Sequence, residues 1–141
     1  MSTSPPAWEI HQALARLAHL ADDGEVADYL DLFAEDAVWE TPEVTATGTK
    51  ADRRAGRADI GDGVIARRAH GIQGPGSATR HLVHTIEVTD GTDGTASSVA
   101  YWAFYRSTTS TAVLAGLGRY DDEWKLTPAG WKLARRKVTL G

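Results

Sequence analysis

The hydrophobic pattern of this chain changes its period once, at the glycine-rich segment 71–76, and that change restricts the folds open to it. Before this segment, apolar residues recur at the three- and four-residue spacing of amphipathic helices. After it, polar and apolar residues alternate, and β-branched and aromatic types become frequent. Helices followed by a run of strands predict an α+β fold, with three helices packed on one face of a curved, mostly antiparallel sheet.

The helical half contains three predicted helices. The first begins with Pro5 and Pro6 after a cap at Ser4 and ends at Asp22-Asp23-Gly24. Its apolar stripe comprises Ile10, Ala13, Leu14, Leu17, Ala18 and Ala21. A shorter helix is expected from Val26 to Phe33, closed by a turn at Glu35-Asp36, and a third spans Ile60 to Arg68. A short strand is expected at 38–40 and a loop at 43–56.

Four predicted strands follow the glycine-rich segment. They cover residues 79–89, 96–106, 112–126 and 131–139, with turns at 90–94 and 127–130. The 141 residues fit one domain, 1–141, with no internal repeat or linker. We expect these strands to form a meander that curls around the helices.

The composition and charge of the chain exclude several kinds of binding partner and chemistry. The net charge of −4 argues against nucleic acid, and no apolar run is long enough to span a membrane. The start of the chain lacks the pattern of a secretory signal, which favours a cytoplasmic location. The absence of cysteine excludes thiolate nucleophiles and sulfur-based zinc sites. Five arginines between Arg53 and Arg68 form a basic patch, interpreted as a solvated helix face or a subunit contact.

Three segments carry a family resemblance. Residues 17–39, with Leu-Ala-His-Leu-Ala-Asp-Asp-Gly-Glu at their start, residues 78–84, Ala-Thr-Arg-His-Leu-Val-His, and the ending 130–136 resemble the SnoaL-like branch of the NTF2-like superfamily. The resemblance implies a cone-shaped α+β fold that encloses a pocket. Within this branch the pattern is closest to scytalone dehydratase, bile-acid dehydratase and lindane dehydrochlorinase.

The resemblance implies an acid–base pair formed by Asp22 and His81. Those relatives place an aspartate near the end of the first helix and a histidine on the first long strand after the third helix, which Asp22 and His81 match. A neutral imidazole suits the removal of a carbon-bound proton near neutral pH, and a carboxylate on its other nitrogen sets the tautomer. The second pocket histidine of scytalone dehydratase corresponds here to Trp102, so the scytalone substrate does not carry over.

Other residues are assigned to the pocket wall. The substrate-binding candidates are Tyr29, Trp39, Trp102, His19 and Arg136, and Phe104 and Tyr105 are further aromatics near the pocket. Of the adjacent Arg135 and Arg136, Arg136 is the one expected to bind a carboxylate or a developing oxyanion. His84 is expected on the opposite sheet face, structural or at a subunit interface, and Asp23 is expected to be exposed.

These observations favour a lyase or isomerase, of the dehydratase type, that needs no cofactor or metal and acts on a small apolar, aromatic or polycyclic substrate. The alternative is a noncatalytic small-ligand binder or an accessory subunit of the same fold. Epoxide hydrolysis and polyketide cyclisation are further alternatives, as is a metal site built from His19, Asp22 and His81. Apolar residues on both sheet faces, together with the relatives, predict a homodimer or homotrimer.

Overall fold

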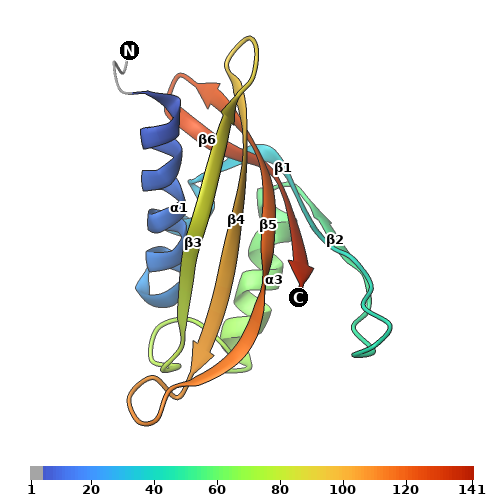
Figure 1. The fold of residues 1–141 in the computed structure, drawn as a ribbon. Coiled ribbons are helices and arrows are strands. Elements are labelled where there is room, and N and C mark those ends of the chain that lie inside the picture. Colours follow the sequence, from blue (N-terminus) through green and yellow to red (C-terminus); the bar gives the residue numbers. More distant parts are fainter. Residues whose placement is uncertain (1–4) are drawn as a thin grey trace.

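The computed structural model describes residues 5–141, and three helices and six strands lie in that range (Figure 1). The helices are α1 (Pro6–Asp23), α2 (Val26–Leu30) and α3 (Arg57–Ala69). The strands are β1 (Phe33–Thr41), β2 (Asp52–Ala55), β3 (Arg80–Asp90), β4 (Thr95–Arg106), β5 (Val113–Thr127) and β6 (Gly130–Leu140). No helix in the described range is long and apolar enough to cross a membrane.

All six strands belong to one sheet, in the order β2-β1-β6-β5-β4-β3. The strands β3 to β6 form an antiparallel meander, β2 is antiparallel to β1, and β1 runs parallel to β6. The sheet is strongly curved, with α1 beside β3 and α3 on the same side near β1 (Figure 1). The predicted fold class, an α+β cone with helices on one face of a curved sheet, is confirmed.

The hydrophobic core fills the space between the helices and the concave face of the sheet. The predicted stripe of α1 supplies Ile10, Leu14 and Leu17, and the sheet supplies Trp124 and Leu133, all almost fully buried. Burial of side chains of this size stabilises a fold by roughly 1.5–3 kcal/mol each. The apolar stripe of α1 therefore fixes which way this helix faces, and with it the direction of Asp22 at its end.

The expected strand at 38–40 lies within β1, but the sequence prediction was wrong on either side of it, at residues 31–37 and in the loop 43–56. The second helix ends at Leu30, and Phe33 to Thr41 is a strand, because its backbone pairs with β6 and β2. The expected loop 43–56 contains β2, an edge strand whose exposed polar side chains lack the alternation that marks a strand. Tertiary pairing overrides local pattern in both places. The expected cap at Ser4 lies outside the described residues, and Pro5 holds the N-cap position.

The arginines between residues 53 and 68 do not form one solvated patch. Arg57 donates to the Phe33 carbonyl, and Arg54 pairs with Asp52. Arg53 is exposed near Glu40. Arg67 and Arg68 both point inward, toward the cavity and toward α1 respectively.

Candidate functional site

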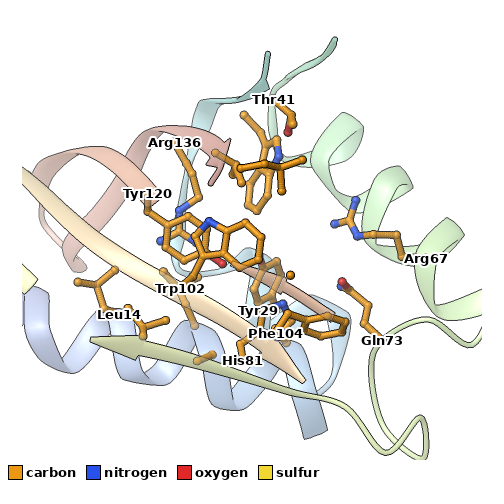
Figure 2. Close-up of a pocket in the computed structure, with 18 of the residues that line it drawn as sticks. Leu14, Tyr29, Thr41, Arg67, Gln73, His81, Trp102, Phe104, Tyr120 and Arg136 are labelled. Carbon is orange, nitrogen blue, oxygen red and sulfur yellow. The ribbon is translucent and has the colours of Figure 1, made fainter. Parts of the chain in front are cut away.

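A cavity of about 380 Å³ lies between α1 and the sheet, as predicted. Its walls come from α1, from β1 and from the inward faces of β3 to β6, and α3 and the segment after it close one side (Figure 2). The side chains directed into it include Leu14, Tyr29, Trp39, Arg67, Gln73, His81, Trp102, Phe104, Tyr120 and Arg136. The lining is thus mostly apolar and aromatic with a few polar groups, the usual character of a small-molecule site.

Asp22 and His81 meet at the wall of this cavity. The Asp22 Oδ1 lies 2.7 Å from His81 Nδ1, and the carboxylate also accepts the His81 backbone N–H at 3.1 and 3.2 Å. The Asp22 side chain is only 5% exposed and that of His81 16%. The predicted hydrogen bond is therefore present, and Asp22 holds both the backbone and the ring of the same histidine.

The local structure explains why Asp22 can be buried at the end of a helix. A carboxylate there opposes the helix dipole, whose negative end is the C-terminus. Arg68 of α3 offsets this, because its Nη1 and Nη2 donate to the carbonyls of Gly24, Leu20 and Ala21 at 2.7–3.4 Å. β3 is an edge strand, so the His81 N–H has no strand partner on that side and takes Asp22 instead.

The ring of His81 is held from two directions. Asp22 engages Nδ1, and the Phe104 ring packs against the imidazole with centroids 4.6 Å apart. A neutral imidazole that donates from Nδ1 to a carboxylate carries its free lone pair on Nε2. Because His81 lines the cavity, Nε2 is the ring nitrogen available to a bound molecule.

The aromatic wall opposite α1 depends on two glycines of β5. The Trp102 indole packs over Gly116 and Gly118, and a Cβ on Gly118 would lie 2.7 Å from this ring and 1.9 Å from the Thr139 carbonyl oxygen. Trp102 stacks on Tyr120 with centroids 6.0 Å apart. Its Nε1 is buried without a hydrogen-bond partner among the described residues. Trp102 thus contributes an apolar aromatic surface to the cavity wall, while its Nε1 donor is enclosed by protein atoms.

Arg136 lies in the cavity wall, as predicted, but its charge is already matched. Its Nε and Nη2 donate to the two Asp122 oxygens at 2.9 Å each, and its guanidinium stacks 3.7 Å above the Tyr120 ring. Burial alone would lower the pKa of Arg136, but the Asp122 carboxylate raises it above its ordinary value. Arg135 points outward and pairs with Glu40. A substrate contact by Arg136 stays a prediction.

Two tyrosine hydroxyls in the cavity stay protonated at neutral pH. Burial raises the pKa of Tyr120 to about 12, against the opposing effect of Arg136. Burial likewise raises the pKa of Tyr29, and the nearby charges of Arg136 and Arg67 limit that rise. Tyr29 therefore offers an O–H donor to the cavity.

Some of the predicted positions need correction. His19 is exposed, because it lies on α1 beyond the edge of the stripe that faces the sheet, so it does not line the cavity. Tyr105 also lies off the cavity, since it points away from the face of β4 that carries Phe104. With His19 exposed, the alternative metal site is not assembled. Within residues 5–141, no three His, Asp or Glu side chains are grouped to hold a metal ion.

Two other expectations hold. His84 is exposed on the outer face of the sheet, where Nδ1 lies 3.1 Å from the Thr85 hydroxyl. Asp23 is exposed and pairs with Arg80 at 2.7 Å. Tyr29, Trp39 and Trp102 line the cavity, as predicted, and their contacts with substrate stay predictions.

Sequence reasoning missed several polar residues of the site, among them Arg67, Gln73 and Asp122. Arg67 was counted with its neighbours as surface charge, and Gln73 lies in the glycine-rich break. For Asp122 a signal existed, since it alternates with Tyr120 and Trp124 on the inward face of β5. A charged residue in the buried phase of a strand indicates a buried partner, here Arg136.

Comparison with protein families identifies the class of protein that this fold and cavity define. Residues 5–137 match the model of the SnoaL-like domain. The chain belongs to this family, a branch of the NTF2-like superfamily. A comparison with curated protein sequences found no significant match.

Solved structures share the fold over nearly the whole chain. An NTF2-like protein with a cystatin-like fold from Novosphingobium aromaticivorans has a TM-score of 0.78 at 24% identity, over 95% of this chain and 80% of the other. The proposed beta subunit of an aromatic-ring-hydroxylating dioxygenase from the same organism has a TM-score of 0.73 at 17% identity, over 94% and 87%. A protein from Catenulispora acidiphila in complex with S-DNPA has a TM-score of 0.74 at 21% identity, over 95% and 92%. At these identities the likeness establishes the fold alone.

Proposed function

We propose that this protein is a lyase or isomerase of the dehydratase type, which acts on a small apolar, aromatic or polycyclic molecule in the cavity. The observation that carries the proposal is the buried Asp22 carboxylate, 2.7 Å from Nδ1 of a histidine that lines the cavity. A protein that only binds an apolar ligand has no need of a polarised imidazole. Positioned acid–base groups of this kind typically contribute a hundredfold to ten-thousandfold in rate, on the order of 10²–10⁴.

In the proposed reaction His81 Nε2 takes a proton from a carbon atom of the substrate. Asp22 keeps the proton on Nδ1 and stabilises the imidazolium that forms. The electron pair of the broken C–H bond forms the new double bond as the leaving group departs from the adjacent carbon. The Tyr29 hydroxyl, which lines the cavity and makes no hydrogen bond within the described chain, is the group we assign to protonate or stabilise that leaving group.

The proposal is tested with 5-nitrobenzisoxazole, a bicyclic aromatic probe. A base removes its ring C–H proton while the N–O bond breaks, and a coloured cyanonitrophenolate is released. Wild-type protein should accelerate this elimination over buffer, and His81→Ala should reduce the acceleration about a hundredfold or more. Asp22→Asn should cost a loss of the same order, because it removes the group that orients the base.

The matched control is His84→Ala, which removes the exposed histidine of the same strand and should leave the rate unchanged. Circular dichroism of each variant establishes that the fold is retained. An acceleration that is equal in wild type, His81→Ala and His84→Ala would refute His81 as the base.

A second function has its own support. The proposed beta subunit of a ring-hydroxylating dioxygenase shares the fold over 94% of this chain, which favours an accessory subunit as the alternative. In that role Asp22 would serve to dock α1 onto the edge strand β3 through the His81 N–H. Asp22→Asn would then lower thermal stability while wild type and variant alike fail to accelerate the elimination.

A further inference from the structure

Most buried arginines in and around the cavity donate to a carboxylate or to backbone carbonyls, but the Arg67 side chain does not. Five arginines of the described chain are buried or half-buried: Arg54, Arg57, Arg67, Arg68 and Arg136. Four of them donate hydrogen bonds to carboxylates or backbone carbonyls. The Arg67 side chain makes no hydrogen bond or ion pair within residues 5–141.

The surroundings of Arg67 leave its guanidinium open to the cavity. Arg67 extends from α3 toward the cavity, and the Gln73 side chain points toward the same region (Figure 2). The face of the Trp39 ring is 6.0 Å from the guanidinium carbon, which is a weak contact. Burial lowers the pKa of Arg67, and the opposing effects of Tyr29 and Asp52 do not cancel this. Arginine stays protonated nonetheless, so a positive charge faces the cavity without a matching anion.

The other charged side chains in or next to the cavity lining already have partners of opposite charge or hydrogen-bond partners. Asp122 occupies two donor groups of Arg136, and Arg54 Nε holds the Asp52 carboxylate at 3.2 Å. Asp22 is engaged by His81. A ligand with one negative charge would therefore find its partner at Arg67.

We propose that the cavity takes aromatic or polycyclic carboxylates, with the Arg67 guanidinium binding the carboxylate and the Gln73 amide donating beside it. This inference rests on the proposed function, because it names the substrate class of the same cavity. The planar fork of arginine matches a carboxylate with two parallel hydrogen bonds. The apolar body of the ligand would lie against Trp39, Trp102 and Phe104, and its reacting carbon would face His81.

The test is calorimetric titration with 2-naphthoate and with its uncharged isostere 2-naphthamide. Wild-type protein should bind 2-naphthoate about tenfold more tightly or better, the range expected for a partly desolvated charge-assisted pair. Arg67→Gln should remove this preference by weakening 2-naphthoate while 2-naphthamide changes by less than about twofold. Arg67→Lys should restore part of the preference, since it returns the charge without the fork.

Arg53→Gln is the matched control, because Arg53 is a nearby arginine whose side chain is 64% exposed and lies off the cavity. It should retain the wild-type preference. His81→Ala should retain it too, so failure of catalysis is distinguishable from failure of carboxylate binding. Equal affinities of the two probes for wild type, no binding of either at millimolar concentration, or an intact preference in Arg67→Gln would each overturn the proposal.

Discussion

Asp122 and Arg136 form the most deeply buried ion pair among residues 5–141. Both are almost fully buried, and two hydrogen bonds of 2.9 Å join them beside the Tyr120 ring. Taking both charges out of water is expensive, and the pairing recovers that cost only while both partners are present. The pair also keeps the positive charge of Arg136 away from ligands, which is why Arg67 is the better candidate for an anion.

Breaking this pair should destabilise the fold strongly. Arg136→Met leaves a buried carboxylate without its partner and should lower the free energy of unfolding by about 3–5 kcal/mol. The double variant Asp122→Leu with Arg136→Met should recover most of that loss. The exposed pair of Arg135 and Glu40 provides the control, since Arg135→Met should cost less than about 1 kcal/mol. Urea denaturation measures all three, and a double variant no more stable than Arg136→Met alone would contradict this account.

Among the secondary-structure elements, the contact between α1 and α3 matters most for the site. The Arg68 side chain of α3 donates to the carbonyls of Leu20 and Ala21 near the end of α1 and to the Gly24 carbonyl just after it. Gly74, with φ +97°, lets the chain turn back tightly against the Arg68 side chain, since a Cβ there would lie 2.8 Å from it. The glycine-rich segment 71–76 thus packs against the Arg68 side chain, which joins α3 to the end of α1.

Removal of this contact should loosen the Asp22–His81 pair as well as the fold. Arg68→Met takes away the charged donors from the end of α1 and should lower the free energy of unfolding by about 1–3 kcal/mol. It should also slow elimination of 5-nitrobenzisoxazole, because Asp22 loses its support. Arg16→Met, on the exposed face of α1, should change neither quantity. Thermal denaturation and the rate assay together check this, and an unaffected Arg68→Met protein would show that Asp22 needs no support from α3.

At the scale of the whole molecule, the helices among residues 5–141 leave one face of the sheet uncovered. Inward residues of β3 to β5 line the cavity, so their neighbours Leu82, Tyr101 and Leu117 face outward and are 46%, 48% and 49% exposed. Leu82 of β3 and Leu117 of β5 both pair with Ala103 of β4, so the three residues lie in one row across the sheet. Apolar side chains arranged in this way on an exposed face are typical of a protein–protein contact.

We expect this face to join copies of the chain into a homodimer or homotrimer. Sedimentation at micromolar concentration should give a mass above that of the monomer for wild type and for Ile65→Glu, a change on the exposed side of α3. Leu117→Glu should shift the protein toward monomer, because it places a charge in the apolar contact. A monomeric wild-type protein would reject the expectation.

The order of elements, the stripe of α1 and the placement of Asp22 and His81 could be predicted because each depends on local pattern or on family resemblance. The period of the apolar residues defines which face of a helix or strand is buried, and that signal is strong in α1 and in β3 to β6. The failures occurred where the pattern was weak. β2 and the first half of β1 exist through backbone pairing with other strands, and His19 lay just outside the buried stripe.

The polar interior of the site depended on contacts between residues far apart in the chain. Arg67 and Arg68 are adjacent in sequence, yet one faces a cavity without a partner and the other binds the carbonyls of α1. Asp122 and Arg136 are both buried because they neutralise each other across β5 and β6. A side chain's charge is encoded in the sequence, but its desolvation and its partner are set by whichever elements pack around it. The sequence therefore determined the fold and the positions of Asp22 and His81, and the packing of α3 and β5 against the rest determined which arginine faces the cavity without a partner.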